Sequence, residues 1–420
     1  MKLPIYKLPE KSKGKDFFYN MFGSSVNAAV SVVLLVVVSH LLDKDAAGIF
    51  TLAYSTAQMM SSVGTFEMRN IQVTDAKHEF GFSSVLGFRL ITVVLMWAAT
   101  AGFILLRGYS GEKAFIIAAV GVYMSFLALS DVFQGNLHFN GYLQTAGRSL
   151  GYVVIIATAV FSAVLALTHS LPIAVTSMTA VPLIWILLYD IPYSRNFNGV
   201  KPEFRLSAFK TIFICALPLF LSQFLNQYIF NAPKYAIDSI MTAADQANYG
   251  YLVMPAFVIN LLSIFAFRPQ LVTLSEHWTN GDFKKFTRIS ARLFLWIAGI
   301  TVAALAGGYF LGIPVLNLLY GAHLNDLRGV FMILLCGGCF SACSTLTLTL
   351  FTTMRKQKVC LIAYGVTSVY AYIVPKILVS ANGMTGAALS FLSETALLFV
   401  CMAIPFIITL STARRRAAAE

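Results

Sequence analysis

The chain has little charge and no long polar segment. Of its 420 residues, 11% are charged and 58% are hydrophobic, whereas a soluble domain carries about 25% charged residues. Twelve apolar runs, each of roughly the 20 residues needed to cross a hydrocarbon core of about 30 Å, take up more than half of the chain. This pattern excludes a soluble globular domain and predicts an all-α integral membrane protein with about twelve transmembrane helices.

The motifs of several common enzyme classes are also missing. The sequence contains no G-x-x-x-x-G-K-[ST] phosphate loop, no H-E-x-x-H zinc motif and no G-x-S-x-G nucleophile elbow. No connector is long enough for an extracytoplasmic catalytic domain. We therefore predict that the protein is not an enzyme and uses no cofactor, apart from H⁺ or Na⁺ as a candidate coupling ion.

Cysteine is scarce, and its six copies all lie in or beside apolar runs. Cys336 and Cys339 have the spacing of a redox or metal motif, but their neighbours are Leu, Gly and Phe. Small side chains of this kind commonly pack between membrane helices. We expect neither a disulfide framework nor a metal site.

Basic residues are abundant, and they concentrate on alternate connectors. The formal net charge is +12, and 24 of the 30 Lys and Arg lie on the cytoplasmic side if both termini are cytoplasmic. Because short loops rich in Lys and Arg are retained in the cytoplasm, we predict an N-in, C-in protein of the cell inner (plasma) membrane. The charges form no single patch, so we expect contact with membrane lipids and no nucleic-acid partner.

The apolar runs divide into two sets of six. We place the spans at residues 18–42, 47–66, 83–107, 113–135, 147–168, 171–190, 211–233, 246–268, 290–312, 327–351, 359–379 and 384–410. The most polar connector falls at the midpoint of the chain. The predicted domains are an N-terminal six-helix lobe (1–194), a cytoplasmic linker (195–210) and a C-terminal six-helix lobe (211–420).

The two halves resemble each other weakly. A shift of 199 residues places Asn226 on Asn27 and Arg268 on Arg69, and a shift of 203 places Arg292 on Arg89. Both halves begin on the same side of the membrane in the predicted topology. This indicates a parallel pseudo-repeat around a central cavity.

The seventh run carries a polar stripe. Gln227, Asn231, Lys234 and Asp238 are spaced by four, three and four residues, which puts them on one helix face. Polar groups are costly in lipid, so this face should line the bundle interior or a wet cavity. Lys234 either binds an anionic group of a substrate or pairs with Asp238 at the outer surface.

The first run carries a stripe with the same spacing. Its members are Asn20, Ser24, Asn27 and Ser31. Amides and hydroxyls of this kind can hydrogen-bond the hydroxyls of a sugar. They can also hydrogen-bond between neighbouring membrane helices, so both interpretations stand.

Two acids are candidates for ion coupling. Glu394 lies about ten residues, or roughly 15 Å, into the last predicted span, where an isolated charge is expensive. It is the leading candidate for a proton or cation site, with Lys376 as one candidate partner. Asp131, near the inner end of the fourth span, is the second candidate.

Four arginines lie at predicted inner ends of spans: Arg69, Arg89, Arg268 and Arg292. Arginine can hold phosphate with two parallel hydrogen bonds, so the four side chains can form a basic entrance for a phosphate group. The alternative is that they only anchor the topology.

One stretch of the sequence resembles a known family. The segment from residue 226 to 251, NQYIFNAPKYAIDSIMTAADQANYGY, is similar to the seventh and eighth spans of Wzx-type flippases. These belong to the polysaccharide-transporter branch of the multidrug, oligosaccharidyl-lipid and polysaccharide exporter superfamily. The matching positions are Asn231, Pro233-Lys234-Tyr235 and Gly250-Tyr251.

The resemblance implies a function. Such a flippase moves an undecaprenyl-pyrophosphate-linked oligosaccharide, the repeat unit of a cell-surface polysaccharide, from the inner to the outer leaflet by alternating access. The expected partners are this lipid-linked substrate and the polysaccharide polymerase and glycosyltransferase machinery. The predicted substrate-binding residues are Asn27, Arg69, Arg89, Asn226, Gln227, Asn231, Lys234, Arg268 and Arg292.

Two other functions stay open. A multidrug cation antiporter of the same fold should have an acidic cavity, whereas the interior candidates here lean basic. A polytopic glycosyltransferase should carry a larger loop with acids or histidines, and this chain has none.

Overall fold

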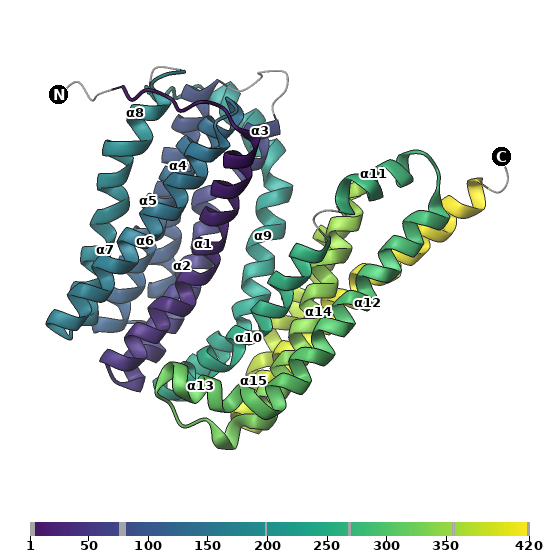
Figure 1. Cartoon of the computed structure of the whole chain (residues 1–420). Helices are drawn as coiled ribbons and strands as arrows, with labels where there is room; N and C mark the ends of the chain where they lie inside the picture. The colour runs from purple at the N-terminus through teal and green to yellow at the C-terminus, as the bar shows by residue number, and fades with distance from the viewer. Residues whose placement is uncertain are drawn as a thin grey trace. The chain divides into compact units, whose positions relative to one another are not determined.

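The computed structural model describes residues 5–74, 81–197, 200–267, 270–354, 356 and 358–417, and within these ranges every regular element is helical (Figure 1). The first part of the chain forms α1 (Lys13–Leu41), α2 (Lys44–Thr65), α3 (Met68–Thr74), α4 (Phe82–Leu106), α5 (Gly111–Phe139), α6 (Leu143–Thr168), α7 (Leu171–Trp185), the π-helical η1 (Ile186–Asp190) and α8 (Ile191–Ser194). The second part forms α9 (Leu206–Ile240), α10 (Ala243–Phe267), α11 (Leu271–Thr279), α12 (Phe283–Gly307), the π-helical η3 (Gly308–Gly312), α13 (Ile313–Tyr320), the 3₁₀ turn η4 (Asn325–Leu327), α14 (Arg328–Thr353) and α15 (Lys358–Ala417).

The protein is a multi-pass membrane protein. Within the described ranges, ten helical segments are long and apolar enough to cross a bilayer. One of them, α15, contains both of the last two predicted spans, joined at Gly383, whose φ of 53° and ψ of −128° interrupt the helix. Such a conformation suits only glycine. Helix α2 coincides with the predicted span 47–66 but is not among the ten, so the count of twelve spans and the N-in orientation stay predictions.

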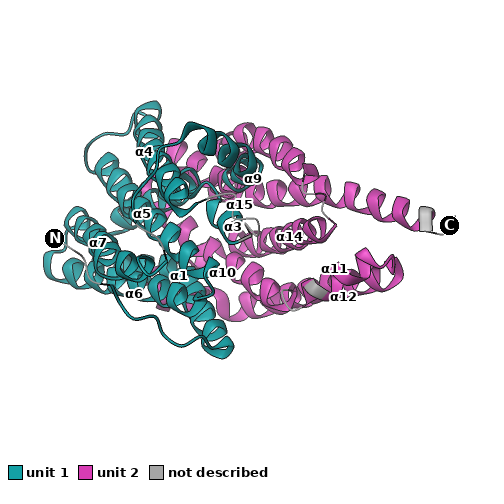
Figure 2. Cartoon of the chain, turned by 90° about the horizontal axis from the view of Figure 1, so that it is seen from above, with its two compact units in different colours: residues 1–224 teal, residues 225–420 magenta. Residues whose placement is uncertain are grey.

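The chain divides into two compact units, unit 1 (residues 1–224) and unit 2 (residues 225–420) (Figure 2). The division falls inside α9, after the predicted linker at 195–210. Each unit is a group of helices that contact one another. The predicted six-helix lobes, the pseudo-repeat and the central cavity stay predictions.

Glycines bring α1 and α6 together in unit 1. Gly147 and Gly151 form a G-x-x-x-G pattern on α6. A methyl group on Gly147 would clash with the carbonyl oxygen of Tyr19, and one on Gly23 would lie 2.5 Å from the carbonyl oxygen of Gly147. The two backbones therefore touch, as in other membrane helix pairs with small residues at the interface.

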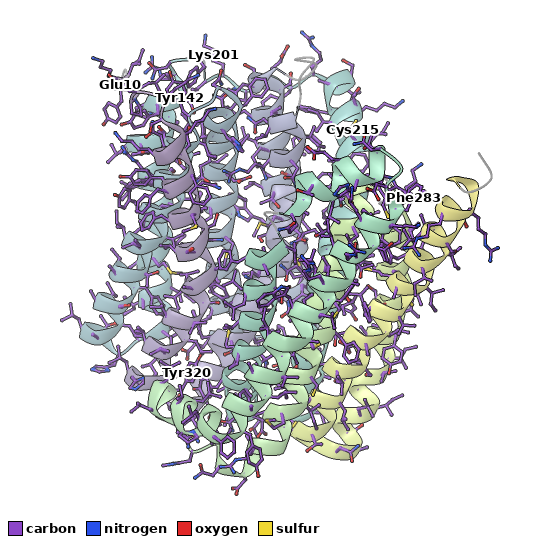
Figure 3. The ribbon with its side chains drawn as sticks, turned by 45° about the vertical axis from the view of Figure 1, so that its right-hand side comes forward. Glu10, Tyr142, Lys201, Cys215, Phe283 and Tyr320 are labelled. Atoms are coloured by element: carbon purple, nitrogen blue, oxygen red, sulfur yellow. The ribbon has the colours of Figure 1, made fainter. Side chains whose placement is uncertain are left out.

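The connectors predicted to be cytoplasmic share one end of unit 1. Figure 3 places Glu10, Tyr142 and Lys201 at this end. The amide of Gln144 donates to the carbonyl of Glu10 at 2.6 Å, and the Lys11 ammonium lies 4.8 Å from the Tyr142 ring centroid. The amino-terminal segment is thus bound to the turn between α5 and α6.

Unit 2 is built around α14, which packs against α10, α12 and α15. Gly338 of α14 meets the backbone of Ala256 on α10, and Gly337 meets the ring of Phe391 on α15. Phe391 also packs edge-on against Phe230 of α9, with ring centroids 5.1 Å apart. This places the carboxyl half of α15 against α9 and α14.

Candidate functional site

A buried ion-pair cluster in unit 1 contains three of the predicted site residues. Asp131 of α5 accepts from Arg69 Nη1 at 3.0 Å and from Arg89 Nη2 at 3.2 Å. The Arg89 side chain is fully buried, while the side chains of Arg69 and Asp131 are 28% and 20% exposed. The carboxylate thus joins α3, α4 and α5 with one buried and one partly open cation.

The end of α2 supplies the second anchor of Arg89. Its Nη1 donates to the carbonyl oxygen of Gly64 at 2.7 Å, and the hydroxyl of Thr92 donates to the same oxygen at 2.7 Å. Carbonyls in the last turn of a helix lack helical partners and carry partial negative charge. Arg89 therefore compensates two negative groups, the Asp131 carboxylate and the α2 terminus.

The turn that follows α2 has an unusual backbone. Phe66 and Glu67 have φ values of 46° and 52°, a left-handed conformation that non-glycine residues rarely adopt. Burial raises the pKa of the Glu67 carboxyl above its ordinary value, and the Asp131 charge adds to this effect. The Arg89 charge and a 2.8 Å hydrogen bond from Asn70 act in the opposite direction.

A second buried acid, Asp190, was not predicted from the sequence. It ends the π-helical segment η1 and is fully buried. Its two carboxylate oxygens accept hydrogen bonds from Ser130 and Ser149, each at 2.6 Å. An acid at the edge of a predicted span, two residues before Pro192, was the available signal.

The two acids belong to one hydrogen-bond network. Gln134 accepts from Arg69 at 3.3 Å and donates to the hydroxyl of Ser130 at 3.0 Å. Trp185 of α7 donates its indole N–H to the Ser149 hydroxyl at 3.0 Å. The network therefore extends from α3 through α5 and α6 to the end of α7. Such connected polar groups hold helices in a fixed arrangement.

These contacts bear on the predicted phosphate entrance. Arg89 is enclosed and engaged, so in this conformation its guanidinium is not open to a phosphate. Arg69 is partly open, and Arg292 on α12 is exposed. The matched positions Arg89 and Arg292 thus have different surroundings, and Arg268 lies outside the described residues. Asp131, predicted as an ion-coupling acid, has both oxygens occupied by arginines.

The polar stripe on α1 is open. Ser24 and Asn27 are exposed, while Asn20 and Ser31 are half-buried. The close contact with α6 lies to one side of this stripe, at Gly23. Hydrogen bonding between packed helices, one of the two predicted roles, would bury these groups, whereas Ser24 and Asn27 are exposed.

The stripe on α9 is enclosed along much of its length. Asn231 and Lys234 are buried, and Asn226, Gln227 and Asp238 are half-buried. The Asn231 side-chain amide donates to the carbonyl of Gln227 at 2.9 Å. Lys234 is thus enclosed by the protein, and both of its predicted roles stay predictions.

Glu394 on α15 is fully buried, and neither of its carboxylate oxygens has a hydrogen-bond partner in the described part of the chain. The Tyr249 hydroxyl of α10 is also buried and has no hydrogen-bond partner in these ranges. The candidate partner Lys376 is exposed, and its ammonium lies 5.0 Å from the ring centroid of Tyr372. The pairing of Lys376 with Glu394 was wrong because the flexible lysine reaches its own helix surface instead.

No cluster of three or more His, Cys, Asp or Glu side chains in the described ranges could hold a metal ion. The predicted site residues instead carry cations, carboxylates, amides and hydroxyls. Such groups can bind anions, protons, alkali cations and sugar hydroxyls.

Comparisons with known proteins identify the fold. An inward-facing multidrug resistance MATE family transporter of the MOP superfamily matches with a TM-score of 0.67 and 14% identity, covering 94% of this chain and 99% of that one. An outward-facing one matches with a TM-score of 0.57 and 13% identity over 97% and 100% of the two chains. No protein-family model matches the sequence, and no curated protein does.

A third match is a MOP superfamily transporter from Pyrococcus furiosus Vc1, described as having a binding pocket of reverse polarity that suggests a different function. Its TM-score is 0.60 at 13% identity, over 97% of this chain and 100% of that one. The chain has the MATE transporter fold. At these identities the likeness establishes fold and leaves the substrate to the chemistry of the site.

Proposed function

We propose that the chain is an alternating-access exporter that moves an undecaprenyl-pyrophosphate-linked oligosaccharide from the inner to the outer leaflet of the cell inner membrane. The MATE fold supports a transport function, and solved neighbours are described as inward-facing and outward-facing. The resemblance of residues 226–251 to Wzx-type flippases supports this substrate class. Polysaccharide polymerase and glycosyltransferases are the partners that this function requires.

The observation that carries the proposal is the open, uncharged polar stripe on α1. Helix α1 is apolar enough to cross a membrane, yet Ser24 and Asn27 are exposed on it. Exposure of such groups to lipid is costly, so this face is best explained if it lines a water-filled path. Amides and hydroxyls both donate and accept hydrogen bonds, which suits the hydroxyls of a sugar better than an organic cation.

The cationic groups suit the pyrophosphate. Lys234 is buried beside Asn231 on α9, and buried lysines in membrane helices commonly mark substrate or ion pathways. Arg69 and Arg292 are sufficiently exposed to collect phosphate, and Arg268 completes the set predicted from sequence. In the proposed mechanism, the α1 stripe binds the sugars, and each of these cations is a candidate for binding the phosphates.

Glu394 is the proposed site of the coupling H⁺ or Na⁺. A buried carboxylate without a hydrogen-bond partner gains more from a proton or cation than one that is already satisfied. Binding there can favour one conformation over the other if the two conformations differ in their affinity for the ion.

Flipping of a fluorescent lipid-linked glycan in proteoliposomes tests the proposal. We expect Asn27→Leu to slow flipping about tenfold, the equivalent of roughly 1.4 kcal/mol, while Val33→Ile, on the opposite side of α1, leaves the rate unchanged. Lys234→Ala with Arg268→Ala should abolish flipping. Undiminished flipping in these variants would overturn the assignment of the residues. A chemically altered glycan would instead indicate a glycosyltransferase.

A multidrug cation antiporter is the second candidate. The buried, unpartnered carboxylate of Glu394 is also the kind of group that binds an organic cation, and the MATE neighbours are described as multidrug resistance transporters. Deletion of the gene separates the two candidates. Drug sensitivity supports the antiporter, whereas accumulation of the lipid-linked intermediate with loss of surface polysaccharide supports the flippase.

A further inference from the structure

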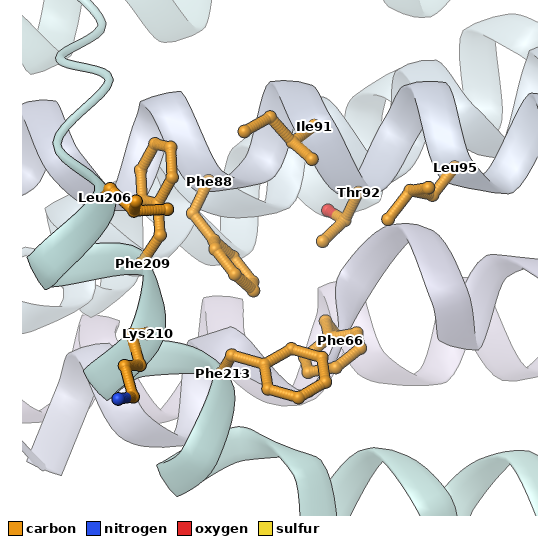
Figure 4. A pocket seen from close by; sticks show the side chains of 9 residues that line it. All are labelled: Phe66, Phe88, Ile91, Thr92, Leu95, Leu206, Phe209, Lys210 and Phe213. Carbon is orange, nitrogen blue, oxygen red and sulfur yellow. The ribbon is translucent and has the colours of Figure 1, made fainter.

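An apolar groove lies between α4 and the first turns of α9, within unit 1 (Figure 4). We call it the α4–α9 groove. It has a volume of about 390 Å³ and is lined by Phe88, Ile91 and Leu95 of α4, Phe209 and Phe213 of α9, and Phe66 of the α2–α3 turn. Its size falls in the range of small-molecule sites, and its walls suit a hydrocarbon chain.

Lys210 is the charged residue among those that line this groove. Lys210 is exposed, and its ammonium points away from the rings (Figure 4). Within the described part of the chain, no hydrogen bond or ion pair engages its Nζ. The other polar side chain of the lining, Thr92, donates its hydroxyl to the Gly64 carbonyl. The groove thus presents an apolar interior with one available positive charge.

The connector before α9 fixes the depth of the cation. The backbone N–H of Glu203 donates to the carbonyl of Ser83 at 2.9 Å, so α4 and α9 begin at the same level. Lys210 follows Leu206, the first residue of its span, by four positions, or about 6 Å at 1.5 Å per residue. Leu95 lies thirteen residues into α4, or about 20 Å. The groove therefore runs from the first turns of these two spans toward the middle of α4.

The groove is open on its outer side and continues along α4. Ile91, Leu95, Leu206 and Phe213 are all exposed. A second hollow of about 300 Å³ shares Ile91 and Leu95 with the groove and extends to Phe204. An exposed apolar furrow of this kind can hold a hydrocarbon chain.

We propose that the α4–α9 groove is a binding site for an anionic phospholipid, with one acyl chain against the phenyl rings and the phosphate on Lys210. Charge complementarity selects the headgroup, because a lysine at the membrane surface contributes about 1 kcal/mol to the binding of anionic lipid. Lys210 is not among the groups that we propose to bind the phosphates of the transported substrate.

Native mass spectrometry of the delipidated full-length protein, titrated with a mixture of phosphatidylglycerol and phosphatidylethanolamine, tests this site. We expect the wild type to prefer phosphatidylglycerol and Lys210→Gln to lose about fivefold of that preference, the factor equivalent to 1 kcal/mol. Lys284→Gln is the matched control, since Lys284 is an exposed lysine at the start of another span, α12. Leu95→Trp, which fills the groove, should reduce retention of both lipids.

Two outcomes would overturn the proposal. Equal loss of preference in Lys210→Gln and Lys284→Gln would mean that the charge acts without a defined site. Displacement of phosphatidylglycerol by undecaprenyl phosphate at equal concentration would make the isoprenoid tail the occupant. Both readouts are binding measurements, so a failure of the glycan-flipping assay would leave them unaffected.

Discussion

Asp131 offers the sharpest test of the buried cluster, because its loss removes the carboxylate that forms an ion pair with the buried Arg89. Asp131→Asn preserves the shape of the side chain and removes the charge. Breaking a buried pair from one side costs about 3–5 kcal/mol, since the remaining charge is uncompensated. Asp131 is 20% exposed and Arg89 keeps its bond to the Gly64 carbonyl, so we expect the lower end, about 3 kcal/mol.

The expected loss translates into a measurable shift. A change of 1 kcal/mol moves the melting temperature of a 150–250-residue protein by about 2–4 °C, and unit 1 spans residues 1–224. We therefore expect Asp131→Asn to lower the midpoint of unit 1 by about 6–12 °C. Thermal unfolding in detergent, followed by tryptophan fluorescence, measures this shift, and Trp185 lies within the same hydrogen-bond network.

Three variants complete the experiment. Asp45→Asn removes an exposed acid from the first turn of α2 and should cost less than about 1 kcal/mol. Arg69→Gln, which removes the partly exposed partner, should cost about 1 kcal/mol. Asp131→Asn combined with Arg89→Met should be more stable than Asp131→Asn alone, because the orphaned charge is gone. A midpoint for Asp131→Asn equal to that of Asp45→Asn would refute the reasoning.

Three further predictions concern packing, the buried carboxylate and pH. Gly147→Ala should destabilise unit 1 by about 1–3 kcal/mol through overpacking against α1. Gly299→Ala, where no atom lies within 4 Å, should instead stabilise α12 by up to about 1 kcal/mol. Thermal unfolding compares the two variants, and equal effects would contradict the close contact between α1 and α6. Glu394→Gln should keep the melting temperature while abolishing transport driven by an ion gradient in proteoliposomes, and transport at the wild-type rate would exclude it as the coupling site. Burial raises the pKa of Glu67, so the contribution of Glu67 to stability is complete below its ordinary pKa of 4.5 and is lost as the pH rises through the higher folded value. Glu67→Gln should therefore flatten the decline of the melting temperature above about pH 4.5. An unchanged dependence of the melting temperature on pH would contradict this.

The positions of the helices could be predicted from the sequence because membrane spans obey a strong constraint. Backbone polar groups in a bilayer must be satisfied within the span itself, so an apolar run of about 20 residues has few alternatives to a helix. Each of the twelve predicted runs coincides with a helical segment in the described ranges. The contacts between side chains follow from the rotation and tilt of each helix, which such runs do not specify. The pairing of Asp190 with two serines could not be anticipated for this reason.

The unlike surroundings of Arg89 and Arg292 had a visible sign in the sequence. Arg89 is buried because Asp131 compensates its charge. The same shift of 203 residues that relates the two arginines places Leu334 opposite Asp131, and Leu334 is fully buried. Without an acid at that position, Arg292 has no reason to be enclosed. A comparison of the residues opposite each arginine, Asp131 and Leu334, would have predicted that Arg89 forms an internal ion pair and that Arg292 does not.

A ligand would meet different surroundings at Asp131, Asp190 and Glu394. Asp131 has two arginines, and Asp190 has two serine hydroxyls. Glu394 has no hydrogen-bond partner in the described ranges. A carboxylate gains the most free energy from a bound proton or cation where it has the fewest hydrogen-bond partners beforehand. Such binding can drive a transport cycle only if the gain differs between two conformations. We therefore infer that the network around Asp131 and Asp190 holds unit 1 together, and that ion-dependent change begins at Glu394 in unit 2.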